Sequence, residues 1–199
     1  MEEKFFQNND IWAFIPEYSK DIGETTRVLF SHGKDRLLPI NIRTFKINLC
    51  SYYSIDYKKG RAKYGKIIGS VNCVPIPITD SKIFLHLKVR VPEVKGDRAM
   101  GYVDLNCIKN YKTGNDRKGV ELELKDGRVI QVLYSISTIN KHMKNARIIL
   151  EYYKRERGYT EYPLNLERLY SGFDKPATKA DIAILAREIA TLKNSLKVF

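Results

Sequence analysis

The chain has 199 residues with 35 Lys and Arg against 23 Asp and Glu, which gives a formal net charge of +12. Its 43% hydrophobic and 11% aromatic residues are globular values and exclude global disorder. Residues 1–26 contain six acids and two lysines, so residues 27–199 carry a net +16 and favour a polyanionic partner.

The protein is expected to work in the cytoplasm, without a membrane span or a metal. The first ten residues lack the charged and then apolar pattern of a secretory signal, and no apolar run approaches the length of a transmembrane helix. Cys50, Cys73 and Cys107 are odd in number and set among apolar residues, which predicts buried free thiols in a reducing compartment. A zinc site would require a Cys-x-x-Cys pair or clustered histidines, and the sequence contains neither.

The first part of the chain is expected to form strands. Residues 11–15 and 28–30 are apolar and bracket a polar link, and Trp12 is expected to be a core anchor rather than a platform for a base. From residue 40 to residue 53 apolar and polar residues roughly alternate. This pattern predicts one or two half-buried strands with a bulge near Thr44.

Residues 57–70, YKKGRAKYGKIIGS, are strongly basic, and no Asp or Glu occurs from residue 57 to residue 79. Three glycines keep the backbone pliable, while two tyrosines offer flat surfaces. The pattern predicts a flexible nucleic-acid contact loop, with a solvated turn as the alternative. The candidate contacts are Lys58, Lys59, Arg61, Lys63 and Lys66 for phosphates, and Tyr57 and Tyr64 for stacking.

Within this stretch, residues 60–66 fit the G-x-x-x-x-G-K start of a P-loop. The next residue should be Ser or Thr to hold magnesium, and it is Ile67. A P-loop must also open a helix, whereas the residues that follow, with Pro75 and Pro77 among them, favour extended structure. A nucleotide site of this type is therefore not expected.

The middle of the chain predicts a meander of antiparallel strands. In residues 83–91 apolar side chains face one way and basic side chains the other. The basic face is either part of a cationic surface or the wet face of a sheet, and it consists of His86, Lys88 and Arg90. Residues 102–111 are expected to form another strand, and 120–124 pairs with 129–134 across a type I′ turn at Asp126-Gly127.

Two helices are expected after the meander. The first is capped by Ser137, runs to about residue 157, and carries an apolar stripe of Ile139, Met143, Ala146, Leu150 and Tyr153. Its other faces are basic, so it either lies along DNA or is a solvated helix, and its candidate DNA contacts are Lys141, Lys144 and Arg147. The second helix spans residues 178–199, and its heptad-like stripe docks on its own domain or on a copy from another subunit. That stripe consists of Ile182, Leu185, Ile189, Leu192 and Leu196.

The expected fold class is α+β, with an antiparallel sheet or meander core, a long helix after the hairpin and a C-terminal amphipathic helix. Residues 1–157 are expected to form a single DNA-binding domain, followed by a connector over 158–177 and the final helix over 178–199. No G-x-S-x-G, H-E-x-x-H or G-x-G-x-x-G motif occurs, and three isolated histidines offer little acid–base chemistry. The protein is therefore expected not to be an enzyme and to use no cofactor.

The order of these segments resembles that of the ComK family, the competence transcription factors of low-GC Gram-positive bacteria, over roughly residues 52–150. The family's Tyr-x-Gly-Arg segment after paired strands is similar to residues 57–61, with one residue extra. Its Pro-Ile and Ile-Phe-Leu segments are similar to residues 75–76 and 83–85. An Asn/Asp-Gly hairpin and a helix then follow, as they do here from residue 126 onward.

Besides the extra residue in the basic stretch, two segments depart from the family pattern. Tyr102 stands where the family has a Trp, and His86-Leu87 stands where it tends to have Phe-Pro. Residues 102–145 also resemble the end of a LytTR domain, another bacterial DNA-binding module, although the His-Arg-Ser segment that usually precedes its Asn is missing.

The ComK resemblance implies a cytoplasmic activator of DNA-uptake genes that binds paired AT-rich boxes as an oligomer, largely through the minor groove and with bending. Narrow minor grooves attract Arg and Lys, so Arg61 is expected to insert while its neighbouring lysines brace phosphates. Family members are also delivered to a Clp protease by an adaptor that grips a short aromatic segment, for which residues 169–173 are the candidate. The alternatives are a single-stranded RNA-binding domain that stacks bases on Tyr57 and Tyr64, and a non-catalytic protein-interaction module for an acidic partner.

Overall fold

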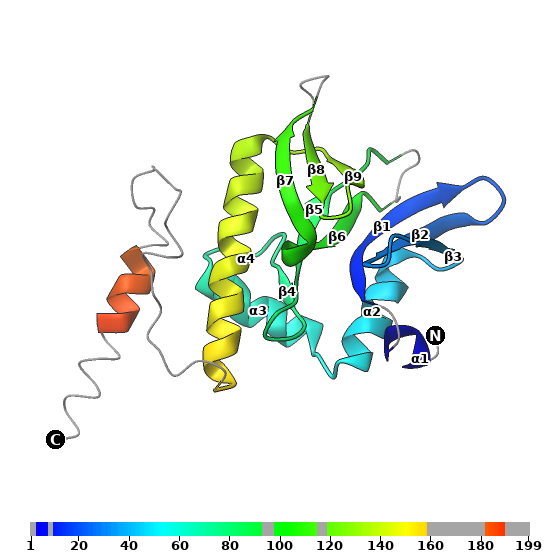
Figure 1. Ribbon diagram of the computed structural model, residues 1–199. Coiled ribbons are helices and arrows are strands. Elements are labelled where there is room, and N and C mark those ends of the chain that lie inside the picture. Colours follow the sequence, from blue (N-terminus) through cyan, green and yellow to red (C-terminus); the bar gives the residue numbers. More distant parts are fainter. Residues whose placement is uncertain (1–2, 8–9, 93–97, 115–118, 159–181, 190–199) are drawn as a thin grey trace.

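The computed structural model describes residues 3–7, 10–92, 98–114, 119–158 and 182–189, and it has an α+β fold (Figure 1). The helices are α1 (Glu3–Gln7), α2 (Ile42–Tyr52), α3 (Tyr57–Ile67) and α4 (Ile136–Glu156), with a short 3₁₀ turn η1 (Leu105–Cys107) and a further helical segment over 182–189. The strands are β1 (Ile11–Ser19), β2 (Gly23–Phe30), β3 (Asp35–Leu38), β4 (Ile76–Pro77), β5 (Ile83–Lys88), β6 (Met100–Asp104), β7 (Ile108–Thr113), β8 (Val120–Leu124) and β9 (Val129–Val132).

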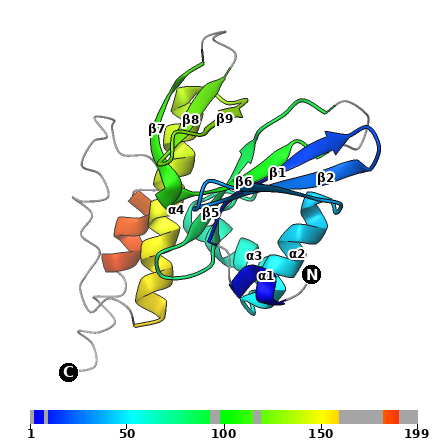
Figure 2. The ribbon, with the colours of Figure 1, turned by 45° about the vertical axis from the view of Figure 1, so that its right-hand side comes forward.

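The strands form two antiparallel sheets. The larger has six strands in the order β3-β2-β1-β6-β5-β4, and the smaller has three in the order β7-β8-β9. Helices α1 and α2 lie against one face of the larger sheet, whereas α4 and the smaller sheet lie on its other side (Figure 2). The larger sheet is therefore covered on both faces.

Strand β5 supplies side chains to both of the cores that result. Phe84 joins the cluster beneath α1 and α2, where it packs edge-on against Phe14 with the ring centroids 5.2 Å apart. Leu85 and Leu87 point to the other side and join the cluster that includes α4 and the smaller sheet. Because neighbouring residues of a strand face opposite ways, this one strand fixes which side chains enter which core.

The predicted meander and the helix after it are confirmed. Strands β7, β8 and β9 pair in sequence order. The cap of α4 is Ser135, two residues before the expected cap Ser137, and its hydroxyl accepts a hydrogen bond from the Thr138 N–H (3.3 Å). The apolar stripe of this helix is buried as expected: Ile139, Met143, Ala146, Leu150 and Tyr153.

The strand expected over residues 102–111 is in fact two strands that belong to different sheets. Strand β6 pairs with β1 and β5, and β7 pairs with β8. The turn η1 separates them, because the Asp104 carboxylate accepts a hydrogen bond from the Asn106 N–H (3.2 Å) and caps the turn. The change of phase at Ile108 marks this crossing between sheets.

The turn at Asp126-Gly127 is also different from the expectation. A type I′ turn requires a positive φ at both central residues, but Gly127 has a φ of 87° and Asp126 is not among the residues with a positive φ. The Gly127 N–H donates to the Leu124 carbonyl (2.9 Å) and the Leu124 N–H donates to the Arg128 carbonyl (2.8 Å). This is a three-residue loop in which glycine takes the left-handed position.

The strands expected over residues 40–53 are wrong, since this stretch is helix α2. The Asn41 side chain caps the helix by accepting a hydrogen bond from the Thr44 N–H (3.0 Å). Ile42, Phe45 and Leu49 are buried at helical spacing, whereas Ile47, which belonged to the apparent alternation, is exposed. Over this short stretch the apolar residues fit both the two-residue period of a strand and the 3.6-residue period of a helix. Packing against the sheet favours the helix.

The flexible loop expected at residues 57–70 is wrong as well. Residues 57–67 form helix α3, which starts where the Asp56 carboxylate accepts a hydrogen bond from the Lys59 N–H (3.0 Å). Gly60 and Gly65 both lie inside this helix, and no strand forms over residues 67–74. The P-loop remains excluded, because its glycine-rich segment would have to precede a helix and here lies within one.

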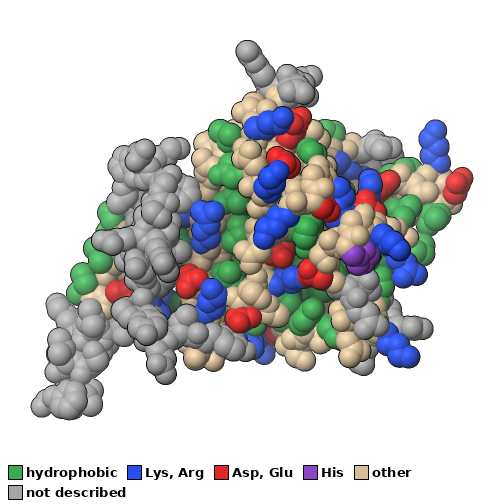
Figure 3. Space-filling model, in the orientation of Figure 1, with side chains coloured by type: hydrophobic (Ala, Val, Ile, Leu, Met, Phe, Trp, Pro, Cys, Tyr) green, Lys and Arg blue, Asp and Glu red, His purple; other side chains and the backbone are tan. Residues whose placement is uncertain are grey.

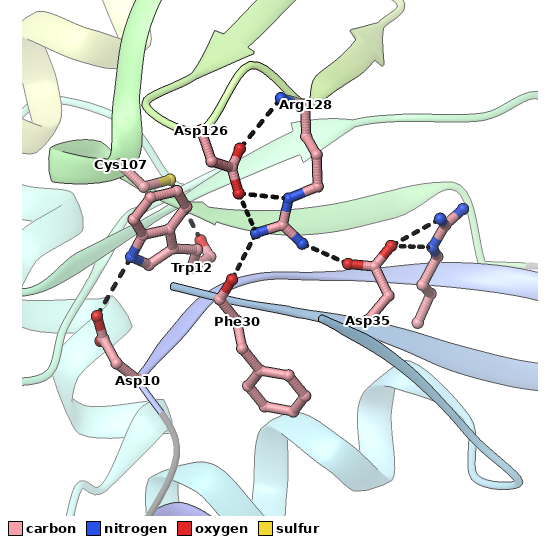
Figure 4. Close-up of polar contacts among 8 residues, drawn as sticks. Asp10, Trp12, Phe30, Asp35, Cys107, Asp126 and Arg128 are labelled. Carbon is pink, nitrogen blue, oxygen red and sulfur yellow. Dashed lines mark hydrogen bonds and ion pairs between the residues drawn. The ribbon is translucent and has the colours of Figure 1, made fainter. Parts of the chain in front are cut away.

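The two sheets are fastened together at Arg128 (Figure 4). Its guanidinium donates to Asp126 in the hairpin turn, to Asp35 of β3 and to the Phe30 carbonyl at the end of β2, and it lies 5.8 Å from the Trp12 ring centroid. These contacts join the β8–β9 hairpin to the far edge of the larger sheet. Trp12 is partly buried against the core there, as expected for an anchor.

The two helical glycines of α3 give a direct test of its structure. A Cβ on Gly60 would meet only the Tyr64 ring at 3.6 Å, so Gly60→Ala is expected to raise the free energy of unfolding by roughly 0.5–1 kcal/mol through better helix propensity. A Cβ on Gly65 would lie 2.6 Å from the Ser70 carbonyl oxygen, so Gly65→Ala is expected to lower it by about 1–3 kcal/mol. Urea unfolding followed by circular dichroism measures both, and a loss of stability in Gly60→Ala would contradict the helix.

Candidate nucleic-acid interface

Helix α3 presents three of its cations on one face. Lys59, Lys63 and Lys66 are exposed and are spaced at i, i+4 and i+7, which aligns them along the helix. We call them the lysine stripe. They line a groove of about 440 Å³, whose apolar lining on α3 is Ala62 and Ile67. The other wall consists of Tyr152 from α4 and Arg187 from the helical segment 182–189.

The far wall of the groove is held together by contacts between α4 and segment 182–189, which lie side by side in Figure 2. The Arg155 guanidinium donates to the Glu188 carboxylate (2.9 Å), and the Arg187 guanidinium lies 5.5 Å from the centroid of the Tyr152 ring. The Lys63 ammonium lies at the same distance from that centroid. The tyrosine ring thus lies between cations from two helices.

Acidic side chains compensate only part of the charge of the lysine stripe. Lys63 forms an ion pair with Glu156 of α4, and Lys59 forms one with Asp56 at 3.5 Å. The Lys59 side chain is 89% exposed, so its pair contributes little. All five cations of α3 are exposed residues of a folded helix, although the charge of Lys63 is partly compensated by Glu156.

Arg61 points away from the groove and is tied to its own chain. Its Nε and Nη2 donate to the carbonyl oxygen of Val71, at 3.0 and 2.6 Å. A carbonyl does not neutralise the guanidinium, so Arg61 keeps its charge while it braces the turn after α3. Lys58 is exposed on the same helix.

The two tyrosines of the basic stretch do not form stacking platforms. Tyr64 is only 9% exposed and belongs to the core beneath α4, where burial, followed by the charge of Glu156, raises its pKa to about 12. Tyr57 is half-buried, and the Lys46 ammonium covers its ring at 3.6 Å. The expectation that these rings stack on bases is therefore corrected.

The three candidate contacts on α4 lie apart from the lysine stripe. Lys141 and Arg147 are exposed and Lys144 is half-buried, and none of the three lines the groove, which α4 reaches at Tyr152. Helix α3 meets α4 at Tyr152 and Glu156, near the C-terminal end of α4. With a rise of 1.5 Å per residue, Tyr152 lies about 16 Å along the helix from Lys141 and about 7.5 Å from Arg147. The structure thus brings together the candidates of α3 but does not bring those of α4 to the same groove.

The basic face expected on β5 is also corrected at His86. Its ring stacks on Tyr102 with centroids 4.6 Å apart and planes 6° from parallel. Burial, and then the charge of Lys46, lowers the pKa of His86 to about 4, so the ring is neutral at pH 7. Lys88 and Arg90 are half-buried.

Comparisons with models of protein families, with curated proteins and with solved structures found no match. The interface must therefore be judged from its own chemistry.

The described residues contain no group of three or more His, Cys, Asp or Glu side chains that could hold a metal, and none of the helices described is long and apolar enough to cross a bilayer. The thiols are poor nucleophiles where they are buried. Burial raises the pKa of Cys50 to about 11 and raises that of Cys107 further, while the Cys107 thiol donates to the Asp104 carbonyl (3.0 Å). Cys73 is half-buried with its sulfur 3.6 Å from the Tyr134 hydroxyl.

Sequence reasoning missed Tyr152, Glu156 and Arg187. All three lie off the apolar stripes by which their helices were recognised, and only the packing of α3 and segment 182–189 against α4 brings them to the groove. The phase of α4 places Tyr152 on the side away from Met143 and Leu150, but nothing in the sequence names its neighbours. The candidate adaptor segment, 169–173, lies outside the described residues.

Two buried groups predict opposite responses of stability to pH. The pKa of His86 falls from 6.5 to about 4 on folding, so its contribution is present above pH 6.5 and is lost as pH falls toward 4. Burial raises the pKa of Asp104 from 3.8 to about 6, so the folded state is favoured below pH 3.8 and loses that advantage as pH rises through 6. His86→Phe should abolish the pH dependence of the free energy of unfolding that is due to His86, and Asp104→Asn should abolish the part due to Asp104. Each part amounts to about 2–3 kcal/mol across its titration.

Urea unfolding of the three proteins between pH 4 and pH 8 measures these slopes. Asn can still cap η1, so Asp104→Asn is expected to be more stable than the wild type at pH 8 and to lose that gain on acidification. Parallel pH profiles for all three proteins would contradict the assignment of both groups.

Proposed function

We propose that this protein binds the phosphate backbone of duplex DNA through the lysine stripe of α3. The single observation that carries the proposal is the groove, in which Lys59, Lys63 and Lys66 stand on one wall and Arg187 on the other. Four cations around one groove concentrate positive potential, and the chain outside its first 26 residues carries a net +16. Phosphate groups are the partner that this chemistry suits best.

The spacing of the lysine stripe supports a polymeric anion. With a rise of 1.5 Å per residue, Lys59 and Lys63 are about 6 Å apart along the helix axis, and Lys66 follows after about 4.5 Å. Successive phosphates of one strand rise about 3.4 Å each along a duplex, so these steps suit a run of phosphates rather than a single anion. Because the lysines stand on a helix, their backbone positions are set before binding.

The ion pair between Lys63 and Glu156 does not oppose such binding strongly. Its partners are 45% and 34% exposed, and pairs of this kind contribute about 0–1 kcal/mol. A phosphate can take the place of Glu156 beside Lys63 at little cost. Release of the carboxylate would also leave Glu156 hydrated at the end of α4.

The resemblance to ComK supports the finer part of the proposal, a transcriptional regulator that prefers AT-rich promoter sites. Arg61 keeps its charge and is exposed, and its bonds to the Val71 carbonyl can be exchanged for acceptors in a narrow minor groove. On this proposal Arg61 supplies the base preference, and the lysine stripe supplies most of the affinity.

The RNA-binding alternative loses its main support. It required Tyr57 and Tyr64 as platforms, and one of these is buried while the other lies beneath Lys46. A protein-interaction module for an acidic partner uses the same cations, and the experiment below separates it from the DNA-binding proposal.

The test compares two triple variants that lose the same charge. Lys59→Gln, Lys63→Gln and Lys66→Gln together are expected to weaken duplex binding at least about tenfold and to reduce the slope of log K against log salt by about three. The control variant replaces Lys20, Lys34 and Lys125, which are exposed on other parts of the protein. It should change the duplex affinity and the salt slope little. Fluorescence anisotropy with AT-rich and GC-rich duplexes at two salt concentrations measures these effects.

Arg61→Ala and Arg61→Lys complete the series. Arg61→Ala should lose the preference for AT-rich duplex, while Arg61→Lys, which keeps the charge, should retain overall affinity. Equal losses in the two triple variants would refute the assignment of the groove. Stronger competition by single-stranded RNA would indicate an RNA-binding protein, and no binding at physiological salt would indicate the protein-interaction module.

A further inference from the structure

The positive charge of the protein is concentrated in one part of the chain. Residues 36–92 contain eleven Lys and Arg and only two acids, Asp56 and Asp80, so this stretch supplies a net +9 of the +12 that the whole chain carries. Helices α2 and α3 and strand β5 are formed by it. The lysine stripe accounts for three of the eleven cations, so most of this charge lies outside the groove.

A second group of cations gathers on the side of α3 that faces α2, beneath the larger sheet (Figure 2). Two of its members are on α2, and the others are on α3, on β5 and just before β6. We call this group the basic cluster, and it consists of Arg43, Lys46, Arg61, Lys88 and Arg98. The three arginines are exposed and the two lysines are half-buried.

The basic cluster is centred on Lys46. Its ammonium lies 3.6 Å from the centroid of the Tyr57 ring and so joins α2 to the first turn of α3. Arg43 stands one turn before Lys46 on α2. Arg61 stands one turn after Tyr57 on α3. Burial lowers the pKa of Lys46, and three positive charges close to its ammonium lower it further. These charges belong to Arg43, Arg61 and Arg98.

Strand β5 adds Lys88 to the same side of the sheet. Lys88 and His86 share a face of the strand, because side chains alternate along it. That face is turned toward α2, since His86 stacks on Tyr102, a residue of the core beneath α2. Burial and then the charge of Lys46 lower the pKa of His86, and the charge of Arg61 contributes as well. The end of β5 thus lies beside the cations of both helices.

Acidic side chains of the described residues do not compensate the basic cluster. Within that part of the chain, none of its five side chains forms an ion pair with Asp or Glu. Arg61 donates to a backbone carbonyl, and Lys46 covers an aromatic ring. Glu24 lies beside the cluster, but its carboxylate accepts from the backbone N–H of Arg98 (2.9 Å) and not from the guanidinium.

Other cations of the protein are interspersed with acids. Over the smaller sheet, blue and red side chains lie next to each other in Figure 3, where Lys109 pairs with Glu123 and Lys112 with Glu121. Two of the three lysines in the stripe also have acidic partners. Like charges that are held together without partners repel one another. The basic cluster therefore gains more from a bound anion than either of these surfaces does.

We propose that the basic cluster is a second surface for the phosphate backbone of nucleic acid, separate from the lysine stripe. Arg61 is two residues from both Lys59 and Lys63, which turns it about 200° around the helix from the stripe. A backbone that reaches Arg61 therefore lies against α2 and β5 and not in the groove. The inference rests on the proposed function, because it assigns the same class of partner to another face of the domain.

The composition of the basic cluster favours phosphate over the carboxylates of an acidic protein. Three of its five cations are arginines, whose planar guanidinium groups donate two parallel hydrogen bonds to phosphate oxygens. Interfaces with nucleic acid are also much more positively charged than those between proteins, in which charged residues are depleted at the centre.

Fluorescence anisotropy of an AT-rich duplex with variants of the full chain tests the cluster. The cluster variant is Arg43→Gln, Lys88→Gln and Arg98→Gln together, and it keeps Lys46 on its ring and Arg61 on its carbonyl. Duplex binding is expected to weaken at least about tenfold, and the slope of log K against log salt to fall by about three. The control variant replaces Lys4, Lys34 and Lys125, exposed residues of other elements, with Gln and should change neither.

Combining the cluster variant with the triple variant of the lysine stripe separates the two surfaces. Their losses in log K are expected to add, because the surfaces share no side chain. A cluster variant that binds like the control would overturn this inference and leave the assignment of the groove intact. A loss in the cluster variant with none in the stripe variant would support the cluster and refute the groove. A wild type that binds no duplex would overturn both, and poly-glutamate that competes as well as duplex DNA of equal charge would overturn the cluster as a nucleic-acid surface.

Discussion

Strand β5 is buried on both faces, and this constraint determines where the other elements lie. Its alternate side chains enter two different cores. Phe84 lies in the core beneath α2, where His86 stacks on Tyr102, whereas Leu85 and Leu87 lie in the core beneath α4. A shift of one residue would exchange the two sets and place a histidine among the aliphatic residues beneath α4. The register of the central strands is therefore strongly specified.

The candidate interface follows from the same arrangement. Helix α3 begins at Tyr57, which packs against the core beneath α2, and reaches the core beneath α4 with Tyr64 and Ile68. Helix α3 thus connects the two cores past the β4 edge of the larger sheet. It is exposed there and lies beside the C-terminal end of α4. The lysine stripe lies on the side of α3 that neither core covers.

The charge of α3 opposes its own folding. Lys59 and Lys63 repel each other at i and i+4, as like charges at this spacing do by about 0.2–0.5 kcal/mol, and the two glycines inside the helix add to the penalty. The Asp56 cap, the pair with Glu156 and the burial of Tyr64 offset these effects. On the proposed function, a polyanionic partner compensates the five cations that this helix carries.

Sequence reasoning succeeded where an element buries one surface and is long enough for its hydrophobic period to be recognised. The alternation in β8 and the stripe of α4 are of this kind, and the structure confirms both. It failed at α2, where a few apolar residues fitted two periods, and at α3, where the glycines suggested a loop. Gly65 is instead a site of close approach to Ser70, which the sequence cannot distinguish from a hinge. The groove depends on Tyr152, Glu156 and Arg187, and their meeting is a result of helix packing that no local pattern encodes.

The proposal that the lysine stripe of α3 grips a nucleic-acid backbone is tested most directly by NMR of the labelled protein titrated with an AT-rich duplex. The account predicts that amide shifts gather along α3 and around Tyr152, and that they disappear at high salt, while the β7–β8 strands stay unchanged. Unperturbed α3 amides at saturating duplex, or shifts gathered on the smaller sheet, would contradict it.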